Sequence, residues 1–328
     1  MTEEAVLFGP RQSLAGIVTE PAIRGDLRTR TAVVLLNAGI VHRVGPGRIY
    51  VKMARALAAM GFVALRFDFS GIGDSAVRHD HLSFEKSAVA EAQEAIEFLK
   101  ATRGIERVLF LGGCSGAFAS LATACCDPRV TGAVLINFQT ADDDHAVAPP
   151  DVSTRKAAHY YWSCALFNLT SWRKLLTGKT DYGQLTRVLW FEVRRRLAFK
   201  KNELREPTHL ETSLGRVAAR RVPLVFVCSG GDPRLQDLRE AGGQVLKRLC
   251  ASGEVVLDVI HGADHTFSSI DDQEHLLKTV CRRIESMQHL PTVRHGLATG
   301  AEAAASCQLL RPAPVVQVGT NARQGRDL

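Results

Sequence analysis

Short apolar runs alternate with segments of helical spacing along most of the chain. Four runs are apolar almost throughout, which is typical of strands buried on both faces of a sheet; they occupy residues 31–39, 62–69, 108–113 and 132–137. Helical spacing over residues 49–60, ending at Gly61, and over residues 84–102 separates the first three runs. The small-residue segment that follows Gly113 predicts a further helix.

The same alternation resumes after a long interruption. Residues 222–232 and 255–260 predict two more strands, and the helix after the first of them extends through Leu249. A last helix is expected near residues 272–287, and residues 4–20 predict two strands around a Gly-Pro turn. This order indicates an α/β fold with a doubly wound, mostly parallel sheet and right-handed crossovers.

The interruption predicts the domain organisation. Residues 141–215 break the alternation and contain all three tryptophans, so we expect a helical cap insertion over the carboxyl ends of the strands. The core then consists of a first part, residues 1–140, and a second part, residues 216–288. Residues 289–328 are rich in Ala, Gly, Pro and Gln and are expected to form a disordered tail.

Composition excludes several classes of protein. The chain has 328 residues, of which 46% are hydrophobic, and no apolar run approaches the roughly 18 residues of a membrane span. The acidic start MTEEAVLFGP lacks the features of a secretory signal. Eight cysteines form no CxxC pair and no zinc spacing, so we expect reduced thiols, a cytoplasmic protein, and no metal or cofactor.

The positive charge is concentrated in one segment. The net charge is +7, and between residues 187 and 221 ten basic side chains less four acidic ones give +6. Such a run suits a solvated helix face, or an acidic partner such as an acyl carrier protein or the phosphates of coenzyme A. No nucleic-acid-binding module accompanies it, so a nucleic-acid role is not expected.

The segment Leu-Gly-Gly-Cys-Ser-Gly-Ala, residues 111–117, lies between a predicted strand and a predicted helix. A nucleophile on such a sharp turn needs very small residues two before and two after it, because the strand and helix backbones nearly touch. Cys114 as nucleophile places glycine at both positions. Ser115 as nucleophile places Gly113 and Ala117 there, which fits less well but stays open.

Together these motifs resemble the α/β-hydrolase superfamily over roughly residues 5–285. The GxCxG string is similar to that of dienelactone hydrolases and cysteine-dependent thioesterases. The strings LNAGIVHRVGPGR, RFDFSGIGDS and GADHTF resemble exosortase-associated hydrolases and their serine-aminopeptidase-like relatives. The resemblance implies a triad in the chain order nucleophile, acid, histidine. Here Cys114 replaces the usual serine, and Asn37-Ala38 replaces the usual His-Gly.

The histidine and acid follow the last two predicted strands. His265, in GADHTF, is the expected base, with His261 a weaker alternative. Asp232, which ends CSGGD, is the expected acid that receives the histidine Nδ1 proton. Residues 142–144 are three aspartates after another strand and remain an alternative acid.

The rest of the expected site follows from the chemistry. An adjacent imidazole raises the thiolate fraction of Cys114 and later protonates the leaving group. The backbone N–H groups of Gly39 and Ser115 are the expected oxyanion hole. Asn37 is a further expected substrate-binding residue, together with two tryptophans of the cap, Trp162 and Trp172. The glycine-rich SGIGDS is interpreted as a tight turn and not as a phosphate site.

Three functions remain open from the sequence. A thioester acyl-enzyme on Cys114 favours a thioesterase, or an acyltransferase or cyclase, acting on a small-molecule acyl thioester or ester with an apolar chain. A carboxylic-ester or lactone hydrolase, with Ser115 as the possible nucleophile, is the alternative among enzymes. A catalytically silent relative that only binds a ligand is the alternative from another class, although it has no physical need for Cys114, Asp232 and His265 together.

Overall fold

The computed structural model describes residues 1–22, 30–80, 82–139 and 207–288 of the chain. Within them, one eight-stranded sheet has the order β1-β2-β4-β3-β5-β6-β7-β8. The strands are β1 (Thr2–Phe8), β2 (Leu14–Glu20), β3 (Thr31–Leu36), β4 (Val63–Phe67), β5 (Arg107–Gly113), β6 (Val130–Ile136), β7 (Leu224–Ser229) and β8 (Val255–Ile260). The β1–β2 and β2–β4 pairs are antiparallel and all other pairs are parallel, which confirms the predicted mostly parallel sheet.

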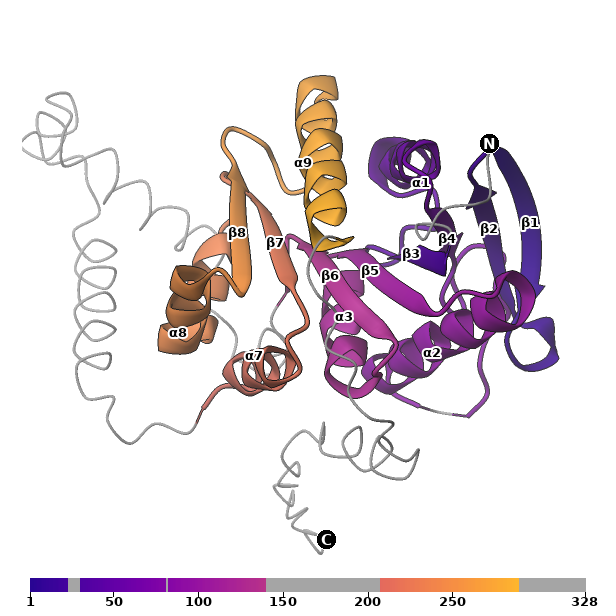
Figure 1. The fold of residues 1–328 in the computed structure, drawn as a ribbon, viewed down its shortest axis with the longest axis horizontal. Coiled ribbons are helices and arrows are strands. Elements are labelled where there is room, and N and C mark those ends of the chain that lie inside the picture. The colour runs from indigo at the N-terminus through magenta and orange to yellow at the C-terminus, as the bar shows by residue number, and fades with distance from the viewer. Residues whose placement is uncertain (23–29, 81, 140–206, 289–328) are drawn as a thin grey trace, which may run out of the picture.

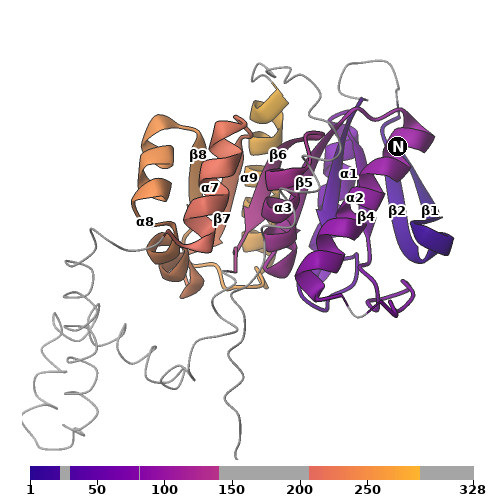
Figure 2. The same cartoon turned by 90° about the horizontal axis from the view of Figure 1, so that it is seen from below.

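Helices cover both faces of this sheet (Figure 1). Helices α1 (Ile49–Ala59) and α9 (Ile270–Gln288) lie on one face, and α2 (Phe84–Arg103), α3 (Ser115–Cys126) and α7 (His209–Ala219) lie on the other, as the view from below also shows (Figure 2). Helix α8 (Arg234–Ser252) packs beside α7 at the β8 edge. The pattern in the sequence therefore predicted the doubly wound architecture correctly.

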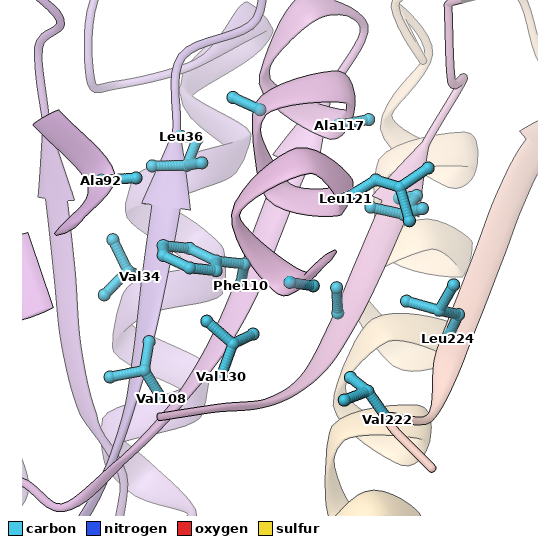
Figure 3. Close-up of a cluster of buried hydrophobic side chains, with 14 of the residues drawn as sticks. Val34, Leu36, Ala92, Val108, Phe110, Ala117, Leu121, Val130, Val222 and Leu224 are labelled. Atoms are coloured by element: carbon cyan, nitrogen blue, oxygen red, sulfur yellow. The ribbon is translucent and has the colours of Figure 1, made fainter. Parts of the chain in front are cut away.

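The core divides into two layers because side chains of a strand alternate between the faces. Val34 and Leu36 pack against the α2 and α3 side together with Phe110, whose ring lies at the centre of that cluster (Figure 3). Val33 and Leu35 point the other way and pack against α1 and α9. All five side chains are buried. Burial on both faces explains why these strands read as continuous apolar runs.

Helix α7 lies across the predicted border between cap and core. Its first turn is held by a capping box, in which Thr208 and Glu211 exchange side-chain-to-backbone hydrogen bonds. Leu210, Leu214 and Val217 form an apolar stripe that is buried in the same cluster as the sheet. The border expected between residues 215 and 216 therefore falls inside a core helix.

The remainder of the expected cap, residues 141–206, and the expected tail, residues 289–328, lie outside the described residues. The same is true of Trp162 and Trp172. Among the helices that the structure describes, none combines the length and the apolar character needed to cross a membrane.

Candidate active site

The predicted catalytic residues lie at the carboxyl ends of three parallel strands. Cys114 follows β5, Asp232 lies in the loop after β7, and His265 lies in the loop after β8. Neighbouring parallel strands bring such ends to one edge of the sheet, where open α/β sheets bind their ligands. His265 Nδ1 donates a hydrogen bond to the Asp232 carboxylate, and the interaction of His265 with Cys114 shifts the pKa of both groups.

Cys114 occupies a strained turn between β5 and α3. Its backbone has φ 54° and ψ −116°, a conformation that residues with a Cβ rarely adopt. A Cβ added to Gly112 would lie 2.2 Å from the carbonyl oxygen of Gly116, and one added to Gly116 would lie 2.4 Å from the carbonyl oxygen of Asn37. The closest approach of strand and helix is thus centred on Cys114 and not on Ser115.

A buried tyrosine supports this turn from the opposite face of the sheet. The Tyr50 hydroxyl accepts a hydrogen bond from the Gly113 N–H at 2.9 Å and donates one to the Leu36 carbonyl, also at 2.9 Å. Tyr50 therefore connects the ends of β3 and β5 directly beside Cys114. This role could not be predicted from the sequence, where Tyr50 occupies an ordinary apolar position of a helix.

His265 is oriented from two sides. Its Nδ1 bonds the Asp232 carboxylate, so Nε2 is the nitrogen that remains for the Cys114 sulfur. Its backbone carbonyl accepts a hydrogen bond from Asn137 Nδ2 at 2.7 Å. The Oδ1 atom of the same Asn137 accepts from the Ser229 N–H at 2.8 Å, in the strand that leads to Asp232. This asparagine fixes the histidine and acid loops to each other.

The charges of the three groups favour a thiolate and an imidazolium. Hydrogen bonds to Asp232 and to Cys114 raise the pKa of His265 from 6.5 to about 9, although burial opposes this. Burial alone would raise the pKa of the Cys114 thiol, but the His265 hydrogen bond, the Arg234 charge and the Ser115 N–H together hold it below its usual value. Burial likewise acts to raise the pKa of Asp232, and the His265 hydrogen bond more than offsets it.

Arg234 adds a permanent positive charge to the site, which sequence reasoning missed. Its Nη1 lies 3.0 Å from Nδ1 and 3.2 Å from Nε2 of His265, so it stands against the ring and cannot donate to both nitrogens in the ring plane. The side chain is 33% exposed and lies 3.7 Å from the Asp232 carboxylate. Its place two residues after Asp232, at the start of α8, was the available signal.

Gln139 is a second residue that the sequence analysis missed. The Cys114 thiol donates a hydrogen bond to Gln139 Oε1 at 3.0 Å. A 180° rotation of the amide would exchange Oε1 for Nε2 and offer a donor to a thiolate. Gln139 follows β6, at the same edge of the sheet as the other site residues, and this position was the signal that could have identified it.

The two expected oxyanion donors lie next to each other. Gly39 adopts φ 59° in the loop after β3, and its N–H donates to the Ser115 hydroxyl at 3.0 Å. Ser115 is the first residue of α3, where backbone N–H groups have no partner within the helix. Its N–H points to the Cys114 sulfur, and in the described part of the chain its hydroxyl makes no contact with His265.

Asn37 has a different place from the one expected. Its side chain is buried, with only 1% exposure, and its amide is committed to the loop. Nδ2 donates to the Val41 carbonyl at 2.8 Å and to Asp68 at 3.3 Å, and Oδ1 accepts from the Phe69 N–H at 2.7 Å. The fully buried Asp68 also binds the guanidinium of Arg43. The structure thus places Asn37 within a network that shapes the Gly39 loop, and not where a ligand could reach it.

The remaining candidates are an alternative base and the alternative acids. His261 is exposed, and Asp264 accepts hydrogen bonds from the N–H groups of Thr266 and Ser268, as expected of a turn residue. Residues 142–144 lie outside the described residues. No group of three or more His, Cys, Asp or Glu side chains is arranged to hold a metal ion within residues 1–22, 30–80, 82–139 and 207–288.

Comparison with known proteins agrees with this fold. A family model described as the alpha/beta hydrolase family matches residues 33–276, which is more than half of the chain. No curated protein matches the chain. Among solved structures, a hypothetical protein of Pseudomonas aeruginosa has a TM-score of 0.54 at 15% identity, covering 88% of this chain and 94% of its own.

Two further solved structures are similar. An esterase of Pyrococcus furiosus has a TM-score of 0.52 at 14% identity, covering 87% of this chain and 91% of its own. A structure from a study of carboxylesterases of Nitrososphaera gargenis has a TM-score of 0.51 at 14% identity, covering 86% and 98%. At these identities the likeness shows the fold alone.

Proposed function

Because the chain belongs to the alpha/beta hydrolase family, we propose that it is an acyl-transferring hydrolase with Cys114 as nucleophile, His265 as base and Asp232 as acid. One observation carries the proposal. Cys114 lies on a strained strand-to-helix turn, and its thiol interacts with a histidine that a buried carboxylate orients. A protein that only bound a ligand would have no use for this combination.

The reaction proceeds through two acyl transfers. The Cys114 thiolate attacks the substrate carbonyl carbon, and the electron pair of the C=O bond moves to oxygen. The backbone N–H of Ser115 and the Gly39 loop stabilise this oxyanion. The intermediate collapses, the leaving group takes the proton of His265, and a thioester remains on Cys114. Neutral His265 then removes a proton from the acceptor, which attacks the thioester and restores the thiolate.

Thioesters are the substrates that this nucleophile favours. Transfer of an acyl group from a thioester to a thiol exchanges one thioester for another, so the acylation step is nearly balanced in energy. Ile40, next to Gly39, is 92% exposed and offers an apolar surface beside the expected carbonyl position. An apolar acyl chain suits such a surface. The proposed activity is that of a thioesterase, or of an acyltransferase or cyclase, and Trp162 and Trp172 remain proposed contacts for the chain.

An acyl carrier protein or coenzyme A as the thiol carrier has weaker support. Of the basic run at residues 187–221, three arginines lie in described segments. Arg220 binds the carbonyls of Ala124 and Asp127 at the end of α3, and Arg221 follows it directly. Both precede β7, whose opposite end leads to Asp232. These two arginines are thus at the wrong edge of the sheet to bind a carrier at the site.

Trapping of the acyl-enzyme tests the proposal. Wild type, Cys114→Ala and Ser115→Ala are incubated briefly with a panel of acyl thioesters and acyl esters, and the intact mass of each protein is measured. We expect an acyl adduct on wild type and Ser115→Ala that is absent from Cys114→Ala. Cys281→Ala is a matched control, because this half-buried thiol lies on α9 and has a raised pKa, chiefly from burial.

Other outcomes would favour a different nucleophile, a different substrate class or a binding function. An adduct lost only in Ser115→Ala would make Ser115 the nucleophile. Adducts from oxygen esters but not from thioesters would favour a carboxylic-ester or lactone hydrolase. Absence of any adduct and of any turnover across the panel would remove the support for an acyl-enzyme and favour a binding protein.

A further inference from the structure

The hydroxyl of Ser115 lies beside both expected oxyanion donors, the N–H groups of Gly39 and of Ser115 itself. Its oxygen accepts the Gly39 N–H at 3.0 Å, and it belongs to the residue whose own N–H is the second expected oxyanion donor. A serine hydroxyl can accept two hydrogen bonds and donate one. Over the described ranges, no acceptor is found for the proton of this hydroxyl, so it is available for a bond to a ligand.

The surroundings leave room for such a ligand. Apart from its chain neighbours, no described residue comes within 4 Å of a Cβ built on Gly39, so this side of the loop is open to the described part of the fold. Ser115 directly follows Cys114 at the start of α3, where the positive end of the helix dipole favours a negative charge. Two adjacent residues therefore supply the nucleophile sulfur (Cys114) and two hydrogen-bond donors, the N–H and the hydroxyl of Ser115.

We propose that the Ser115 hydroxyl is a catalytic hydrogen-bond donor, which receives the Gly39 N–H and donates its own proton to the oxyanion of the tetrahedral intermediate. The inference rests on the proposed acyl transfer at Cys114. When the C–S bond forms, the electron pair of the carbonyl bond moves to oxygen, and Ser115 donates a hydrogen bond without losing its proton. When the intermediate collapses, that bond weakens, because the carbonyl oxygen again carries only a partial charge.

The bond from Gly39 strengthens this donor. A hydroxyl that accepts a hydrogen bond becomes more polarised and donates more strongly, as in other hydrogen-bonded chains. Gly39 would then act through Ser115, and the usual pair of backbone donors becomes one backbone and one hydroxyl donor. The opposite role is a hydroxyl that merely blocks the hole in the free enzyme. The two roles predict opposite effects of removing it.

The experiment compares Ser115→Ala, Ser115→Thr and Ser120→Ala on a thioester that wild type turns over. Ser120 is the matched control, because it lies in the same helix and its hydroxyl donates to the Gly116 carbonyl within that helix, at 2.7 Å. We expect Ser115→Ala to lower kcat about 10- to 100-fold, somewhat less than complete loss of an oxyanion donor. KM should change little, and Ser115→Thr should keep most of the wild-type kcat.

Alkylation of Cys114 by iodoacetamide separates this role from others. Alkylation forms no oxyanion, so Ser115→Ala should react at the wild-type rate even though its kcat is reduced. A kcat equal to or above that of wild type in Ser115→Ala would overturn the inference in favour of a blocking or passive hydroxyl. Equal loss of alkylation and of kcat would overturn it in favour of a structural role. If instead Cys114→Ala remained active, the proposed nucleophile itself would be wrong.

Discussion

Tyr50 accepts the Gly113 N–H through its hydroxyl and donates to the Leu36 carbonyl, at the last paired position of the β3–β5 ladder, Leu36 with Gly112. The hydroxyl therefore links the two strand ends where β3 leads into the Gly39 loop and β5 leads into Cys114.

Removal of this hydroxyl should affect stability and catalysis together. Tyr50→Phe leaves the Gly113 N–H and the Leu36 carbonyl buried without their partner, which costs about 1–3 kcal/mol of unfolding free energy. Loss of the bridge also frees the end of β5 to move relative to the end of β3, which would shift Cys114 relative to Gly39. We expect a lower urea midpoint and a reduced kcat.

Thr123→Val is the control for that experiment. It removes a buried hydroxyl of similar environment from α3, whose only bond is to the Ala119 carbonyl within the helix. Its kcat should stay at the wild-type value. A Tyr50→Phe enzyme with wild-type kcat and a lowered midpoint would show that the bridge stabilises the fold without positioning the site.

The contact between α3 and the end of β3 leaves no space for a methyl group at Gly116. A Cβ there would lie 2.4 Å from the Asn37 carbonyl oxygen and 2.6 Å from that of Leu36, and both atoms are backbone. Gly116→Ala should therefore cost about 3 kcal/mol or more, at the upper end of single substitutions. Unfolding by urea, together with the yield of folded protein, measures this.

Gly215→Ala should change the stability of the protein in the opposite direction. Gly215 lies within α7, and nothing lies within 4 Å of its Cβ position. Alanine there should stabilise the protein by about 0.5–1 kcal/mol, since glycine disfavours helix interiors. Similar losses at both positions would mean that the strand-to-helix contact does not set the requirement at Gly116.

The pH dependence of kcat/KM should be bell-shaped. Acylation needs the Cys114 thiolate, which forms as the pH rises through a pKa held below its usual value. It also needs the imidazolium proton for the leaving group, which is lost as the pH rises through the His265 pKa of about 9. We therefore expect a plateau that ends near pH 9, measured with a thioester of constant ionisation.

Asp232→Asn tests the assignment of the alkaline limb. The Asp232 hydrogen bond is the largest cause of the raised His265 pKa, so its loss should move this limb to lower pH. The neutral amide also permits the wrong imidazole tautomer, which should lower kcat at every pH. An alkaline limb that stays in place in Asp232→Asn would assign it to another group.

Arg234 should control the reactivity of Cys114 through its charge. The guanidinium lowers the pKa of the thiol and opposes protonation of His265. Arg234→Gln should therefore raise the pKa of Cys114 and slow its alkylation by iodoacetamide near neutral pH, and Arg234→Lys should restore part of the rate. Arg248→Gln, an exposed arginine later in α8, is the control. An unchanged pH profile of alkylation in Arg234→Gln would contradict this role.

The sequence predicted the framework well because burial imposes a regular pattern. Val33 to Leu36 all face protein, so the strand reads as an unbroken apolar run whichever side each residue packs against. Cys114 could be identified because steric limits at Gly112 and Gly116 act on neighbours in the sequence. Asp232 and His265 were placed through the resemblance, and the structure brings them within hydrogen-bonding reach of each other.

Residues whose roles depend on distant partners could not be predicted in this way. Tyr50 meets Gly113 across the sheet, and Gln139 meets Cys114 from another strand, so neither leaves a local pattern. Asn37 was expected to bind substrate, but its amide bonds buried groups around Asp68, which lies 31 residues further along the chain. The predicted border between cap and core fell inside α7, because the sequence of this helix resembles the segment before it. The apolar stripe of α7 nevertheless belongs to the core.

The asparagine between the two loops has one more consequence. Asn137 binds the Ser229 amide and the His265 carbonyl with the two ends of one carboxamide group. The distance between these two bonded groups is therefore set by the dimensions of one planar amide. Glutamine at this position would add one methylene of reach and of freedom. While both hydrogen bonds hold, the loop that carries the acid cannot move far without the loop that carries the base.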